Sequence, residues 1–75
     1  MALKVDCSPG HAGDAEPVAL WFGQRKVEVV GILDRWWGTG MRWWKVDTGE
    51  GPYVVRLDQR TGDWDLAAIP RRDPS

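Results

Sequence analysis

The sequence predicts an all-β fold, a five-stranded antiparallel meander curled into a small open barrel of SH3-like or OB-like size. Runs rich in Val, Ile, Leu, Trp and Tyr recur along the chain, and glycine-containing turns separate them roughly every 8 to 12 residues. A chain of 75 residues has room for one domain without a second layer of helices. A twisted sheet with one uncovered apolar face therefore has to curl on itself.

The expected domain spans residues 17–69. Residues 1–16 contain Pro9, Gly10 and Gly13 among scattered charges, so we expect a mobile N-terminal arm. Residues 70–75 have similar character and predict a disordered tail. The start of the chain lacks the apolar run of a signal peptide, no segment approaches the ~18 apolar residues of a membrane span, and there is one cysteine. These features predict a cytoplasmic protein that does not associate with membranes.

The first two predicted strands meet at a glycine turn. Strand 18–22 is apolar and ends at the pair Gly23-Gln24, which suits a two-residue hairpin turn. Strand 25–37 is the longest and carries alternating apolar residues such as Val27 and Val29. Gly31 interrupts it and is a plausible bulge, which would reverse the faces of the residues on one side.

Three further strands follow in hairpins. Strand 41–47 begins after the turn 39–40, strand 52–59 after the turn 48–51, and strand 63–69 after the turn 59–62. These turns set registers in which Leu33 faces Val46 and Tyr53 faces Ala68. All four hairpins collect apolar side chains on the same face, which is the expected core: Val18, Leu20, Phe22, Val27, Val29, Leu33, Trp44, Val46, Tyr53, Val55, Leu57, Trp64 and Leu66.

Two adjacent tryptophan pairs, at 36–37 and 43–44, cannot point entirely into one core because neighbouring residues on a strand face opposite sides. The register places Trp36 opposite Trp43 on the outer face, with Arg56 and then Asp65 next in the row. A parallel row begins with Asp34, Lys45 and Val54. Three interpretations remain open: barrel closure or a bulge buries these side chains, they bind a ligand, or they form a homodimer seam.

If the surface binds single-stranded nucleic acid, Trp36 and Trp43 would stack on bases while basic residues contact the phosphates. The candidate basic residues are Arg35, Arg42, Lys45, Arg56 and Arg60. The net charge is -1, but Lys and Arg outnumber Asp and Glu between residues 25 and 60. Aromatic residues interleaved with basic ones equally suit an extended or proline-rich segment of a partner protein, and we expect a monomer or a weak homodimer.

No enzymatic site is predicted. Cys7 and His11 have a metal-like spacing, but zinc requires three or four protein ligands and the chain has no other cysteine or histidine. The carboxylates of Asp63 and Asp65 flank Trp64, where charges on an edge strand explain them better than acid–base catalysis. We therefore expect neither a metal nor another cofactor.

The spaced aromatics also resemble a known family. The turn Phe22-Gly-x-Arg25, the pair Trp43-Trp44 and the closing Trp64-x-Leu66 are similar to a small uncharacterised bacterial domain. That domain occurs alone and at the C-terminus of the polymerase-like subunit of mutagenesis cassettes, which are relatives of Y-family translesion DNA polymerases. The resemblance covers residues 17–69. It implies a non-enzymatic accessory module in a DNA-maintenance complex, linked to DNA repair or damage tolerance, and no polymerase activity.

Overall fold

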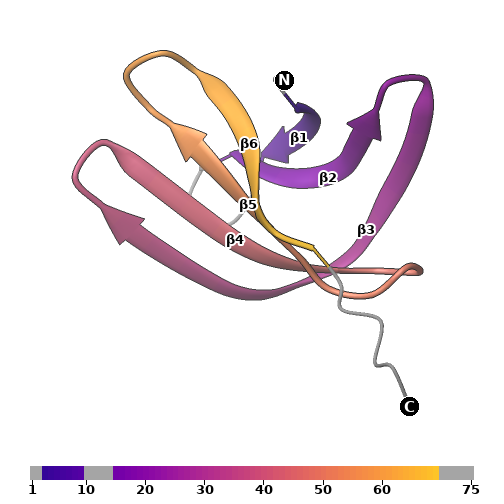
Figure 1. Cartoon of the computed structure of the whole chain (residues 1–75). Coiled ribbons are helices and arrows are strands. Elements are labelled where there is room, and N and C mark those ends of the chain that lie inside the picture. The colour runs from indigo at the N-terminus through magenta and orange to yellow at the C-terminus, as the bar shows by residue number, and fades with distance from the viewer. Residues whose placement is uncertain (1–2, 10–14, 70–75) are drawn as a thin grey trace.

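The computed structural model describes residues 3–9 and 15–69, and it contains six antiparallel strands in sequential order (Figure 1). The strands are β1 (Lys4–Pro9), β2 (Ala15–Phe22), β3 (Arg25–Gly38), β4 (Met41–Thr48), β5 (Tyr53–Asp58) and β6 (Asp63–Ala68). The sheet curls into a half-barrel, and the backbone N–H of Leu3 donates to the carbonyl of Trp64 at 3.0 Å, which brings the start of β1 to β6. The predicted fold class is confirmed, with one strand more than expected.

The additional strand, β1, lies in the segment that we expected to be a mobile arm. It pairs antiparallel with β2, from Lys4 opposite Trp21 to Pro9 opposite Ala15. Leu3 and Val5 pack against the core, and the indole N–H of Trp21 donates to the Asp6 carboxylate at 2.8 Å. The apolar alternation in this segment is too short to be distinguished from a loop, and its ordering depends on contacts distant in the sequence. Residues 70–75, the expected tail, lie outside the described part of the chain.

Two hairpin turns depend on glycine. Gly23 and Gly40 have φ angles of 64° and 70°, a region that residues with a Cβ rarely adopt. These glycines close the β2–β3 and β3–β4 hairpins, where Phe22 stands opposite Arg25 and Gly38 opposite Met41. The turn chemistry therefore produces the registers on which the sequence prediction rested.

Two β-bulges interrupt β3 where it pairs with β4. The register passes through Val29–Thr48, Gly31–Asp47, Ile32–Val46 and Asp34–Lys45, so it shifts at Val30 and again at Leu33. One bulge would invert every later side chain, but two restore the original alternation. Trp36 consequently remains opposite Trp43, as predicted. Only the segment between the bulges changes face, while Val29, before the first bulge, keeps its face and is displaced by two residues along β4.

The core lies inside the curl. Its central cluster consists of Leu20, Val27, Trp44, Val46, Tyr53 and Val55, all of which were predicted, and Ala19, which was not predicted, is buried as well. The rings of Trp44 and Trp64 are 5.0 Å apart, and those of Phe22 and Tyr53 are 5.5 Å apart. Large aromatic side chains thus supply much of the buried area in a chain too small for a broad aliphatic core.

Three details of the predicted core and register are wrong. Leu33 is 55% exposed because it is the extra residue of the second bulge, and Ile32 takes the place opposite Val46. Val18 is 40% exposed because it is the extra residue of a bulge in β2, where the pairing with β1 passes from Asp6 opposite Ala19 to Cys7 opposite Pro17. Ala67 is an extra residue of β6 in its pairing with β5, which sets Ala68 opposite Val54 instead of Tyr53.

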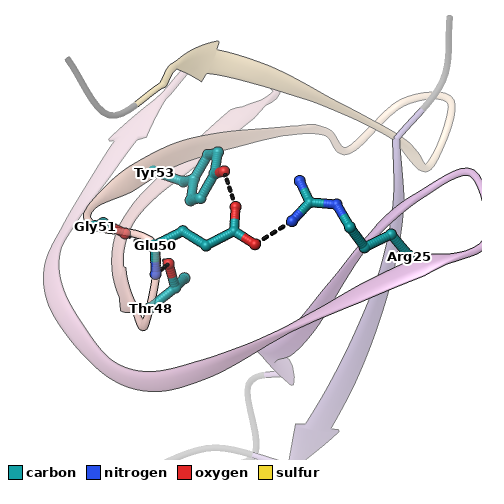
Figure 2. Close-up of polar contacts among 5 residues, drawn as sticks. All are labelled: Arg25, Thr48, Glu50, Gly51 and Tyr53. Atoms are coloured by element: carbon teal, nitrogen blue, oxygen red, sulfur yellow. Dashed lines mark hydrogen bonds and ion pairs between the residues drawn. The ribbon is translucent and has the colours of Figure 1, made fainter. Parts of the chain in front are cut away.

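A polar cluster joins the start of β3 to the β4–β5 turn, as Figure 2 shows. The Glu50 carboxylate accepts a hydrogen bond from the Tyr53 hydroxyl at 2.9 Å and pairs with the Arg25 guanidinium. Thr48 orders the same turn, since its hydroxyl donates to the Gly51 carbonyl at 2.7 Å. The Arg25 and Tyr53 bonds hold the pKa of Glu50 below its usual value, while burial and the Glu50 bond raise the pKa of Tyr53.

Candidate binding surface

The outer face of the sheet, opposite the core, carries a row of four side chains across β3 to β6. Trp36 stands opposite Trp43, Trp43 opposite Arg56, and Arg56 opposite Asp65, as the hairpin registers predict. Trp36 is 41% exposed, and the other three are half-buried. We call these four residues the outer row. It offers an aromatic end on β3 and β4 and a charged end on β5 and β6.

The charged end of the outer row is an ion pair. An Arg56 terminal nitrogen lies 2.6 Å from an Asp65 carboxylate oxygen, and both side chains are partly exposed. The hydrogen bond and the charge of Asp65 raise the pKa of the Arg56 guanidinium. The positive charge of Arg56 is therefore already compensated within the sheet.

The aromatic end is shaped by a glycine. A Cβ at Gly38 would lie 2.9 Å from Cζ3 of Trp43, which means that the Trp43 ring lies directly over the Gly38 backbone. Gly38 and Trp36 occupy alternate positions of β3 and so share the outer face. The Trp43 ring thereby covers the end of the hairpin, while Trp36 keeps a larger exposed area.

The second row on this face contains Asp34 opposite Lys45 and Lys45 opposite Val54, as predicted. The Asp34 carboxylate accepts a hydrogen bond from the backbone N–H of its neighbour Arg35 at 2.8 Å. Lys45 is half-buried between Asp34 and Val54. It is the one member of the predicted basic set, besides Arg56, that shares the outer face with Trp36 and Trp43.

The other two arginines of the predicted site lie on the core face. Arg35 stands opposite Trp44 and forms an ion pair with Glu16 of β2. Arg42 is only 9% exposed, and its guanidinium carbon lies 4.7 Å from the ring centre of Trp44 and 5.4 Å from that of Trp37. The structure therefore does not bring Arg35 and Arg42 together with the tryptophans of the outer row.

Sequence reasoning did not include Trp37 in the site, although it is 64% exposed. Trp37 lies on the core face at the tip of the β3–β4 hairpin, beyond the curled part of the core, where it covers Arg42. With Val30, Leu33 and Trp36 it makes the second half of β3 the most apolar exposed stretch among the described strands. Its position next to the turn is the signal that could have identified it, because a residue at the end of a hairpin has fewer neighbours to bury it than one in the middle of the sheet.

The outer face carries more carboxylates than cations. Its basic residues on β3 to β6 are Lys26, Lys45 and Arg56, whereas its acidic residues are Glu28, Asp34, Asp47, Asp58, Asp63 and Asp65. The arginines elsewhere in the described strands and turns are engaged as well: Arg25 pairs with Glu50, and Arg60 lies 3.4 Å from Asp58. The basic excess of residues 25–60 is thus not displayed around Trp36 and Trp43.

The described residues contain no group of three His, Cys, Asp or Glu side chains that could hold a metal ion. Cys7 lies on β1 opposite Pro17, whereas His11 falls outside the described residues. Asp63 stands opposite Asp58 on the outer face, and Asp65 forms an ion pair with Arg56. Within residues 3–9 and 15–69, no helix is long and apolar enough to span a bilayer.

No family model matches the chain, and neither a curated protein nor a solved structure matches it.

Proposed function

We propose that this chain is a non-enzymatic binding module whose outer face recognises an extended segment of a partner protein. Trp36 and Trp43 form an aromatic surface on a rigid hairpin, and tryptophan is among the side chains that contribute most binding energy at protein interfaces. The pleated outer face suits a partner segment with alternating contacts, including a proline-rich one.

The charge of the outer face is the observation that favours a protein segment over single-stranded nucleic acid as the ligand. Single-stranded nucleic acid is bound by a positive groove in which free cations contact phosphates and aromatic rings stack on bases. Here Asp34 lies beside Lys45, and Asp65 neutralises Arg56, while Arg35 and Arg42 lie on the core face. A phosphate backbone laid along the outer row would meet more carboxylates than cations.

The same charge favours a partner segment with lysines or arginines. Basic side chains of the partner would lie close to Asp34, Asp47 and Asp63, and an apolar or proline residue would lie on Trp36. The resemblance to a domain of mutagenesis cassettes supports a partner within a DNA-maintenance complex. The module would then act as an accessory contact with another protein, with no part in the chemistry on DNA.

The proposal is tested by observing the indole N–H signals in a proton–nitrogen correlation spectrum. The probe is a proline- and lysine-rich peptide of about ten residues, and a (dT)12 oligonucleotide is titrated in parallel at low and moderate salt. We expect the signals of Trp36 and Trp43 to shift with the peptide while the buried Trp44 stays in place as an internal control. Trp36→Ala should weaken peptide binding about tenfold or more.

A matched control is Val18→Ala, which removes a side chain of similar exposure from β2, away from the outer row. It should leave the peptide affinity unchanged. Tighter binding of the oligonucleotide, with affinity falling steeply as salt rises, would replace the protein ligand by nucleic acid. The absence of any shift with the peptide at millimolar concentration would overturn the proposal.

A further inference from the structure

The second half of β3 has a strand neighbour on one side only. Its residues from Val29 to Gly38 pair with β4, whereas the pairing of β3 with β2 ends at Glu28. In Figure 1 this half of β3 borders the sheet formed with β4, β5 and β6. Among the described residues, then, one edge of β3 carries backbone groups that no strand satisfies.

The alternation of β3 identifies the residues whose backbone groups face that edge. The N–H of Arg35 is bonded to the Asp34 carboxylate at 2.8 Å, so it is not part of the ladder with β4. In an antiparallel pair, every second residue directs its N–H and C=O to the same side. Trp37 therefore faces the open edge together with Arg35, while Trp36 between them directs its backbone groups to Trp43.

We propose that a second copy of this chain adds to this edge, so that two β3 strands pair antiparallel about a two-fold axis at Trp36. Residues that stand opposite each other in such a pair share a face of the continuous sheet. With the axis at Trp36, the two Trp36 side chains meet on the outer face, and each Arg35 stands opposite Trp37 of the other copy. Arg35 and Trp37 then exchange backbone hydrogen bonds with the partner strand, and the Arg35 N–H donates to a carbonyl of the other copy in place of the Asp34 carboxylate.

The charges of Asp34 and Arg35 favour a two-fold axis at Trp36 over an axis at an adjacent residue. An axis at Arg35 would set two guanidinium groups against each other, and an axis at Asp34 would do the same with two carboxylates, both of which are unfavourable. An axis at Trp37 would place Arg35 beyond the end of the partner strand, opposite its turn. The register at Trp36 instead sets each Arg35 guanidinium, which also pairs with Glu16 of its own chain, against the Trp37 ring of the other copy, and symmetry repeats the contact.

The bulges limit the length of this contact. Leu33 and Val30 are extra residues that break the regular spacing of backbone groups, so strand pairing between copies stops at Asp34. An interface this short predicts a weak dimer, with a dissociation constant on the order of 100 µM. Because a partner peptide is not needed, this inference is independent of the proposed function. It also goes beyond it, since the dimer joins two outer rows into one aromatic strip.

Two experiments test the proposed dimer: one measures self-association of the chain, and the other measures disulfide cross-linking at the two-fold axis. Sedimentation equilibrium of the full chain, from about 10 µM to about 1 mM, should show a monomer that converts to a dimer. In a Cys7→Ser background, Trp36→Cys places two thiols directly opposite each other, at a spacing that a disulfide can bridge. Trp37→Cys is the control, because the introduced thiols would lie two residues out of register.

We expect oxidation to cross-link the Trp36→Cys variant at least tenfold faster than the Trp37→Cys variant. Both positions are exposed, so each variant should keep the far-ultraviolet circular dichroism of the parent chain. A chain that stays monomeric at 1 mM, or cross-linking that is equal or faster through Trp37→Cys, would overturn the proposal. Neither result depends on whether the chain binds a peptide, so the two proposals can fail separately.

Discussion

The ring of Trp43 lies so close over Gly38 that a Cβ added to the glycine would be 2.9 Å from Cζ3 of the ring. The contact joins the two strands of the hairpin that carries Trp36, and it sets the shape of the aromatic end of the outer row. The space that Gly38 leaves open is therefore occupied by an aromatic side chain of the candidate surface.

Gly38→Ala should displace the Trp43 ring. Replacing glycine by alanine in a strand normally gives a small gain in stability, but here the methyl group cannot fit beneath the ring. We expect a loss of about 1 kcal/mol in the free energy of unfolding and a shift of the Trp43 indole N–H signal. Gly49→Ala is the matched control, because nothing lies within 4 Å of its added Cβ. Equal effects of the two substitutions would contradict the contact.

Leu20→Ala and Leu33→Ala should differ sharply in stability. Leu20 is fully buried, so its truncation leaves a cavity and should cost about 2 to 5 kcal/mol. Leu33 occupies the second bulge and is 55% exposed, so its truncation should cost less than about 0.5 kcal/mol. Urea unfolding followed by tryptophan fluorescence measures both. A large loss from Leu33→Ala would mean that Leu33 belongs to the core.

The Glu50 cluster should make stability depend on pH at both ends of the range. The folded pKa of Glu50 is lowered, so its contribution is present above the ordinary value of 4.5 and is lost as pH falls through the folded value. The folded pKa of Tyr53 is raised, so its contribution is present below the ordinary value of 10.0 and is lost as pH rises through the folded value.

Glu50→Gln should therefore lower stability at neutral pH and flatten the acid side of the profile. The measurement is the urea midpoint at intervals between about pH 3 and pH 7. Glu28→Gln, on the exposed face of β3, serves as the control and should leave the acid slope unchanged. An acid slope that is identical in the parent chain and in Glu50→Gln would contradict a role for this carboxylate.

Arg42→Lys should destabilise the hairpin although it keeps the charge. The Arg42 guanidinium lies near the rings of Trp37 and Trp44, and a lysine ammonium cannot present a planar group to both. We expect a loss of about 1 to 2 kcal/mol in the free energy of unfolding. Lys45→Arg, on the outer face of the same strand, should change it by less than about 0.5 kcal/mol. Equal stability of Arg42→Lys and the parent would refute the stacking contribution.

The hairpins could be predicted from sequence because each is specified locally. A short glycine turn fixes the register, and alternation then assigns the faces, which is why Trp44 opposite Val55 and Trp36 opposite Trp43 were both correct. The incorrect predictions are at bulges, which neither the turn sequences nor the alternation of side chains indicates. Nothing in the residues around Leu33 marks it as a bulge, and the same holds for Val18, the extra residue in the pairing of β2 with β1.

The candidate site was predictable in its aromatic part and not in its charged part. Alternation alone places Trp36 and Trp43 together, but it also places Arg35 and Arg42 on the opposite face, where Glu16 and the ring of Trp44 engage them. Grouping these arginines with the tryptophans relied on residue type and ignored the face. The ion pair between Arg35 and Glu16 joins β3 to β2 beyond the stretch in which these two strands pair, which no local pattern indicates.

The paired bulges in β3 make the fold sensitive to whether changes in strand length are odd or even. Removing Val30 alone would leave one insertion, so either Val27 or Trp37 would have to turn to the other side of the sheet. Removing both Val30 and Leu33 would keep every remaining side chain on its present side. Shortening this strand by two residues should thus be tolerated better than shortening it by one.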